Sequence, residues 1–146
     1  MGNINLDFSV IWDWMPTFLE GAMVTIVLSL STVIIGSLIG LVVVLMKMSN
    51  FKPLNIIANL YTNIVRGTPM LLQLYVWLYG LPMLGISFSG LSFLGGAYGS
   101  REFITAIVAL AINSGAYVSE VGRGGLESVD KGQTEAGRAL GLSKRE

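Results

Sequence analysis

The chain has 146 residues, carries no formal net charge at neutral pH and contains neither Cys nor His. Only 12% of its residues are charged, against about 25% in ordinary soluble domains, whereas 53% are hydrophobic, so the chain is predicted to form a single all-α domain embedded in a membrane. The balanced charge argues against nucleic acid as a partner, and the absence of Cys and His excludes thiol nucleophiles, disulfides, imidazole bases and Cys/His metal sites.

The first 16 residues predict an interfacial anchor rather than a cleaved leader. Trp12 and Trp14 directly precede a long apolar run, and indole rings favour the headgroup level of a membrane. A frayed terminus with stray aromatic residues is the alternative. No Lys or Arg precedes Lys47, so the basic region of a secretory signal is missing, and Leu6 stands where N-myristoylation requires Ser or Thr.

A first membrane span is predicted over about residues 17–46. A helix of this length measures about 45 Å, enough to cross a hydrocarbon core of about 30 Å with tilt, and Glu20 is its only charged residue. Gly36 and Gly40 form a GxxxG pair, which lets a second helix approach closely. The alternative is that Gly is simply frequent in membrane helices.

The first basic residues of the chain follow this span. Lys47 and Lys52, together with Asn50 and Pro53, predict a loop. Because basic residues concentrate on the cytoplasmic side of membrane proteins, this loop is expected in the cytoplasm and the acidic N-terminus outside.

The next apolar stretch is interrupted by an RGTP sequence that begins at Arg66. Thr68 is a good N-cap and Pro69 suits the first helical position, so a new helix is expected to start there. This second span is predicted over residues 69–86, most of which form a helix of about 24 Å. Arg at mid-bilayer costs about 2.5 to 3.5 kcal/mol, so Arg66 is expected near the inner surface. Residues 54–65 then lie along the inner interface or in a tilted half-helix.

A Gly- and Ser-rich segment without charge, residues 85–100, predicts an external loop. A third span follows over about residues 101–122, and the glycines after Arg123 are expected to end its helix. The remainder, residues 126–146, contains four basic residues and is predicted to be cytoplasmic. Three spans with the N-terminus outside satisfy the charge bias of every loop.

Three polar residues of the third span share one helical face. Asn113, Tyr117 and Glu120 follow the spacing i, i+4, i+7. A polar stripe on a membrane helix faces protein or a water-filled path rather than lipid. Two interpretations remain open: these side chains line a substrate pathway, or they form interhelical hydrogen bonds, with Glu120 paired to Arg123 or Arg66.

The helix predicted after Thr68 also has two interpretations. Its N-terminus offers free N–H groups to an anionic group such as a substrate carboxylate. A plain capped helix start is the simpler interpretation. Gln73, one turn into the helix, is a further polar candidate.

A short helix is predicted near the end of the chain, over residues 133–140, with Gly141 as its C-terminal cap. Its small apolar side chains lie on one face: Ala136, Ala139 and Leu140. Such a face suits insertion into the groove of another protein. A solvated tail is the alternative.

Two stretches carry a family resemblance. Residues 65–74 read VRGTPMLLQL, and residues 113–143 read NSGAYVSEVGRGGLESVDKGQTEAGRALGLS. They resemble the patterns RGTPLLVQL and NxGAYxxExxRGGxxSVxKGQxEAAxALG of the permease subunits of bacterial ABC importers, in the branch for polar amino acids. The resemblance covers nearly the whole chain. It implies a multi-pass protein of the bacterial cytoplasmic membrane, in which residues 1–146 are the N-terminal part of one transmembrane domain and two further helices are missing.

The resemblance implies a role for the terminal helix. In this family the EAA loop is a cytoplasmic coupling helix that docks into a groove on the nucleotide-binding subunit, and closure of the ATPase dimer drives rigid-body alternating access. Here the coupling residues are Glu135, Ala136, Gly137, Leu140 and Gly141. Gly137 replaces the second Ala of the motif, which loosens the helix by up to ~1 kcal/mol.

The resemblance also implies the partners: an identical or similar second permease subunit, two ATPase subunits and an extracellular amino-acid-binding protein. The chain has no Walker A sequence, so it is not expected to bind ATP itself. Without His, Cys or paired carboxylates on one helix, no enzyme activity, cofactor or metal is predicted for it. Polarity and position, rather than the resemblance, suggest the candidates for the substrate pathway: Arg66, Thr68, Gln73, Asn113, Tyr117 and Glu120. A membrane scaffold that binds a cytoplasmic partner without transport is the alternative function.

Overall fold

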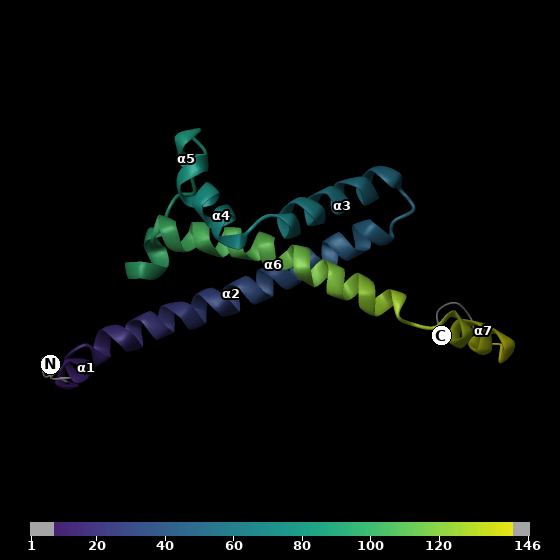
Figure 1. Ribbon diagram of the computed structural model, residues 1–146, viewed down its shortest axis with the longest axis horizontal. Helices are drawn as coiled ribbons and strands as arrows, with labels where there is room; N and C mark the ends of the chain where they lie inside the picture. Colours follow the sequence, from purple (N-terminus) through teal and green to yellow (C-terminus); the bar gives the residue numbers. More distant parts are fainter. Residues whose placement is uncertain (1–7, 142–146) are drawn as a thin grey trace, which may run out of the picture.

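The computed structural model describes residues 8–141, apart from the side chains of Lys131 and Thr134. Within these residues all regular elements are helices, as predicted (Figure 1). After a short α1 (Ser9–Asp13), two long helices dominate: α2 (Met15–Met48) and α6 (Arg101–Glu127). Both are long and apolar enough to cross a membrane. The first and third predicted spans lie within them.

Both long helices extend beyond their predicted ends. The loop predicted around Lys47 and Lys52 exists but is shorter than expected, because α2 continues through Lys47 to Met48 and only residues 49–51 separate α2 from the next helix. The helix end expected after Arg123 is wrong. Gly124 and Gly125 keep ordinary helical backbone angles rather than positive φ, and Arg123 pairs with Glu residues on both sides of it along α6, which strengthens this turn.

α2 and α6 pack closely and run in the same direction. Gly36 and Gly40 are buried against Ser114 and Val118, and a Cβ atom on Gly40 would lie only 2.6 Å from Cγ1 of Val118. In return, Gly115 of α6 receives the side chain of Ile39. These small residues let the two backbones approach closely, as membrane helices without a hydrophobic driving force require.

The glycine contact gives a prediction for stability. Gly40→Leu is expected to destabilise the protein by about 1 to 3 kcal/mol, because the larger side chain overpacks the α2–α6 contact. Gly21→Leu is the matched control in the same helix, since nothing lies within 4 Å of a Cβ atom there. The thermal midpoint of each purified variant in detergent measures its stability. Equal midpoints for the two variants would contradict the packing role.

α3 (Lys52–Gly67) turns its polar face inward. Thr62 is 1% exposed, and the Tyr61 hydroxyl donates a hydrogen bond to the carbonyl of Ile112 in α6. The apolar side chains point away from α2 and α6 and are more than half exposed: Ile56, Ile57, Leu60 and Ile64. This arrangement is the reverse of a helix on a soluble protein, and it is the one expected of a helix whose outer face meets lipid.

The second predicted span is shorter than expected. Its helical turns are α4 (Met70–Tyr75), the π-helical η1 (Val76–Gly80) and α5 (Leu81–Met83). Together they extend about 21 Å, less than the ~30 Å hydrocarbon core. A crossing by this helix alone is therefore not confirmed.

The start of this helix also differs from the prediction. Pro69, with extended backbone angles, is the N-cap of α4, so the cap predicted at Thr68 is wrong. The Thr68 hydroxyl instead donates back to the carbonyl of Ile64 in α3, at 3.0 Å. The Thr68 hydroxyl therefore bonds to the last turn of α3 rather than to the start of α4.

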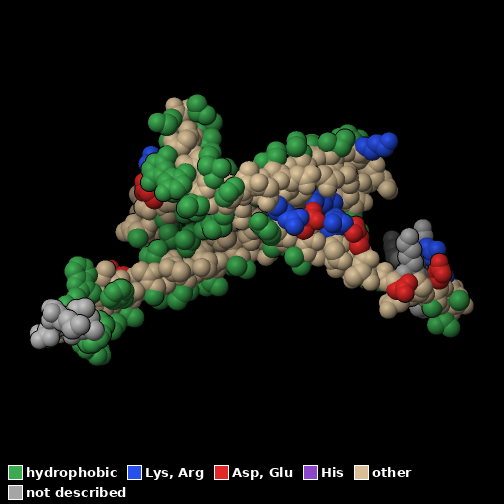
Figure 2. Space-filling model, viewed as in Figure 1, with side chains coloured by type: hydrophobic (Ala, Val, Ile, Leu, Met, Phe, Trp, Pro, Cys, Tyr) green, Lys and Arg blue, Asp and Glu red, His purple; other side chains and the backbone are tan. Residues whose placement is uncertain are grey.

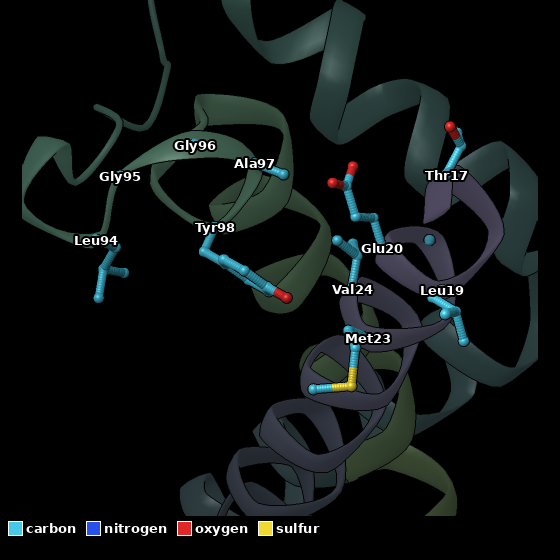
Figure 3. A pocket seen from close by; sticks show the side chains of 11 residues that line it. Thr17, Leu19, Glu20, Met23, Val24, Leu94, Gly95, Gly96, Ala97 and Tyr98 are labelled. Atoms are coloured by element: carbon cyan, nitrogen blue, oxygen red, sulfur yellow. The ribbon is translucent and has the colours of Figure 1, made fainter. Parts of the chain in front are cut away.

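The external loop predicted over residues 85–100 contains only two short 3₁₀ turns, η2 (Ser92–Leu94) and η3 (Gly96–Gly99). A pocket of about 800 Å³ lies between η3 and the first turns of α2. Figure 3 shows the side chain of Glu20 extending from α2 toward the η3 turn, which carries Tyr98. Beyond the far end of α6 lies α7 (Lys131–Ala139), apart from the other helices (Figure 1).

Candidate functional site

Charged side chains gather where α2, α3 and α6 meet, in the blue and red patch between α3 and α6 in Figure 2. We call this group the ion cluster, and it comprises Lys47, Arg66, Glu120, Arg123 and Glu127. The side chains of Lys47 and Glu120 are only 2% and 19% exposed. Burial of this kind is favourable only where the charges are well paired and hydrogen-bonded.

Glu120 is the centre of the ion cluster. Its Oε1 atom accepts a hydrogen bond from the ammonium group of Lys47. Its Oε2 atom accepts from Nη2 of Arg123 at 3.0 Å, and Nη1 of Arg66 lies 3.6 Å away. One carboxylate on α6 therefore links α2 and α3 through cations of both helices.

Two members of the ion cluster, Lys47 and Glu127, were not predicted from the sequence, and Lys47 is the buried one. Besides Glu120, its ammonium group donates to the hydroxyl of Thr62 at 2.8 Å. Lys47 lies 11 residues after Gly36 and 7 after Gly40, a spacing that puts all three on one helical face. This periodicity would have indicated that Lys47 faces α6 rather than a loop.

A second group of polar side chains lies at the break between α3 and α4 and consists of Thr68, Gln73 and Asn113. Nε2 of Gln73 donates to the carbonyl of Val65 and to the hydroxyl of Thr68, both at 2.7 Å. Oε1 of Gln73 accepts from Nδ2 of Asn113 at 3.1 Å. Gln73 thus donates to a carbonyl that has no partner within α3, because the helix ends there. Its bond with Asn113 also connects this segment to α6.

Tyr117 lies between these two groups along α6. The residue is 47% exposed, and the Arg66 guanidinium lies 5.5 Å from the ring centroid, within the range of a cation–π contact. The structure therefore brings the six pathway candidates into one polar strip along α6. Thr68 and Gln73 also border a small cavity of about 160 Å³ beside Trp77.

This polar strip presents charged and hydrogen-bonding side chains that can bind and orient a charged group. Glu120 is engaged by several cations, which leaves it poorly suited to act as a general base. No group of three or more Asp, Glu, His or Cys residues is arranged to hold a metal ion anywhere in the described residues.

α7 is an amphipathic helix with defined ends. Oδ1 of Asp130 accepts the N–H of Gly132 at 2.8 Å and caps the N-terminus. Gly141 has a φ of +83° and donates its N–H to the carbonyl of Arg138 at 3.0 Å, as expected of a C-terminal glycine. The helix includes Glu135, Ala136 and Gly137. Leu140, just beyond it, is 82% exposed, so its apolar side chain is available to another protein.

Residues 33–146 match the protein-family model described as binding-protein-dependent transport system inner membrane component. The chain belongs to this family. The match covers most of the sequence, including the polar strip and α7, and it confirms the resemblance to importer permeases.

Several proteins that are similar to this chain are named as permeases of transport systems. The chain is 43% identical over 139 residues to the arginine transport system permease protein ArtQ of Bacillus subtilis, covering 95% of this chain and 58% of that protein. It is 42% identical over 126 residues to the putative glutamine transport system permease protein GlnP of Rickettsia conorii, covering 86% and 52%. It is 36% identical over 140 residues to the nopaline transport system permease protein NocM of Agrobacterium fabrum, covering 94% and 56%.

A solved structure has the same fold. The crystal structure of an amino acid ABC transporter with histidines superposes with a TM-score of 0.81 at 39% sequence identity, covering 97% of this chain and 61% of that one. The chain thus has the fold of an ABC permease. It spans between half and three fifths of the length of these curated relatives.

Proposed function

We propose that this chain is a membrane-spanning subunit of an ATP-driven importer for polar amino acids in the bacterial cytoplasmic membrane. The family match over residues 33–146 is the observation that carries the proposal. The arginine and glutamine named for its relatives support a polar amino acid as substrate. Because the relatives are longer, we propose that residues 1–146 form the N-terminal part of a single transmembrane domain.

We infer three crossings with the N-terminus outside. α2 and α6 run parallel, so two membrane-spanning helices in this arrangement require the residues between them to return the chain across the bilayer. α3 and residues 70–83 measure about 24 and 21 Å, so together they suffice for one crossing as two half-helices. Lys47, Lys52 and the basic residues of α7 then share one side, as the charge bias of cytoplasmic segments favours.

The polar strip is the proposed substrate pathway. It comprises Arg66, Thr68, Gln73, Asn113, Tyr117 and Glu120. Discontinuous helices in transporters bind substrates near their break, where backbone and side-chain polar groups face a cavity. A cation on one side of the break, Arg66, suits the α-carboxylate of an amino acid.

α7 is the proposed coupling helix. Residues Glu135 to Gly141 would dock into a groove of a cytoplasmic ATPase subunit, and movement of that subunit would be transmitted along α6 to the polar strip. The free apolar face at Leu140 and the defined ends of α7 support this role. The other partners are a second permease subunit, a second ATPase subunit and an extracellular amino-acid-binding protein.

Reconstituted transport tests the function. Proteoliposomes that contain the complete permease, its ATPase and its binding protein are expected to accumulate one labelled polar amino acid only with ATP. Arginine and glutamine head the panel because of the relatives' names. Omission of the binding protein or of ATP provides the controls. An assembled complex that binds its ATPase but transports no amino acid would support the scaffold function instead.

A further inference from the structure

Lys47 is the one buried residue among the charged side chains that the structure describes. Its ammonium group contacts the hydroxyl of Thr62 and Oε1 of Glu120. Thr62 is itself 1% exposed. Partners on α3 and on α6 therefore hold this ammonium group in one position between the three helices.

The two oxygen atoms of Glu120 have different partners. Lys47 occupies Oε1, whereas Arg123 donates to Oε2 through Nε at 3.2 Å and Nη2 at 3.0 Å. Nη1 of Arg66 stops 3.6 Å from Oε2, outside hydrogen-bonding distance. Glu120 is thus neutralised and hydrogen-bonded without Arg66.

The charge balance of the ion cluster makes Arg66 its surplus cation. The cluster holds three cations and two carboxylates. Arg123 is hydrogen-bonded to both Glu120 and Glu127, and Lys47 is bonded to Glu120. The side chain of Arg66 is 44% exposed and rests beside the Tyr117 ring. A guanidinium in this state retains the paired donors that match a carboxylate.

We propose that Lys47 is a positioning residue for substrate recognition: it occupies Oε1 of Glu120, neutralises that carboxylate and so keeps Arg66 available for the α-carboxylate of an amino acid. The inference rests on the proposed import function and adds a residue to the pathway. Without the positive charge of Lys47, the negative charges of Glu120 and Glu127 equal the positive charges of Arg66 and Arg123. Attraction across the short remaining gap then draws Arg66 onto Glu120 and away from the substrate.

Equilibrium binding tests this role directly. The complex of complete permease and ATPase is prepared in detergent without the binding protein, so that only the membrane site binds labelled L-arginine. L-argininamide, which lacks the carboxylate, is the competitor. If the uptake panel identifies glutamine as the substrate, L-glutamine and its α-amide replace this pair.

The parent is expected to bind the acid at least about tenfold more tightly than the amide, because a charge-assisted hydrogen bond is lost with the carboxylate. In Lys47→Met, the Kd for the acid is expected to rise by at least about tenfold and the acid-to-amide preference to approach one. Lys47→Arg restores the charge and is expected to keep the parental preference. Lys47→Gln is the second neutral variant, in case Lys47→Met does not assemble.

The outcomes separate positioning from a merely structural role. A structural role would lower yield or thermal stability and leave the acid-to-amide preference of the assembled complex unchanged, which would overturn the inference. A parental preference near one would overturn it as well, even if no neutral variant assembles. Absence of ATP-dependent uptake by the parent would contradict the proposed function, whereas a transporting parent with unaffected neutral variants contradicts the Lys47 role alone.

Discussion

Gly141→Val in the complete permease is expected to reduce ATP-dependent amino-acid uptake to near background while the ATPase subunits continue to hydrolyse ATP. Gly141 ends α7 with a φ of +83°. A β-branched side chain in this left-handed conformation costs about 1 to 2 kcal/mol, a factor of about 5 to 30 in the population of the helix end. The last turn of α7 then loses the shape that the proposed ATPase groove receives.

Gly141→Asn is the matched control for this variant, because Asn tolerates the left-handed conformation. It is expected to retain more uptake than Gly141→Val. Uptake and phosphate release are measured on the same proteoliposomes, so that their ratio reports coupling. Glu135→Trp, which adds bulk to an exposed position of α7, is expected to uncouple as well. Parental uptake in both Gly141→Val and Glu135→Trp would remove the coupling role of α7.

Glu120→Gln is expected to destabilise the permease by about 3 to 5 kcal/mol, the range for loss of one partner from a buried ion pair. The variant leaves the ammonium group of Lys47 buried with neutral partners only. Lys47→Met should cost less, because Glu120 keeps Arg123 and gains Arg66. The thermal midpoint of the purified permease in detergent, with the parent measured alongside, gives the order of the variants.

Glu127→Gln is the control for this comparison. Glu127 belongs to the same ion cluster and pairs with Arg123, but its side chain is 64% exposed. An exposed pair contributes about 0 to 1 kcal/mol, so the midpoint should scarcely change. A midpoint for Glu120→Gln equal to that of Glu127→Gln would show that the buried carboxylate does not hold the three helices together.

The long helices were predictable because length and apolar composition alone determine them. Residues 17–46 and 101–122 lie within α2 and α6. Their ends were not predictable from the same rules. Lys47 suggested a loop because it is charged, and Gly124 and Gly125 suggested a helix end because they are flexible. Both signals are local. Lys47 stays helical because it pairs with Glu120, which is distant in the sequence, and the helix continues past Arg123 because this residue pairs with Glu120 and Glu127 along α6.

The polar stripe of α6 was predictable from its spacing, but its partners were not. Asn113, Tyr117 and Glu120 lie on one face, and the structure shows the Arg66 and Arg123 partners that were left open for Glu120. Which of them serve the substrate and which only join helices depends on contacts that spacing does not encode. The Thr68–Gln73–Asn113 connection needed a helix break with a particular geometry.

The reversed polarity of α3 has a consequence for biosynthesis. The residues of α6 that form hydrogen bonds with the polar side chains of α2 and α3 are synthesised late. Glu120 follows Lys47 by 73 positions, and translation at 5 to 20 residues per second makes this a delay of roughly 4 to 15 s. During this interval the nascent chain already contains Lys47 near the end of α2 and the polar inner face of α3. Neither of them yet has its hydrogen-bond partner on α6. The polar groups of α2 and α3 therefore obtain their partners on α6 only after the ribosome has made that helix.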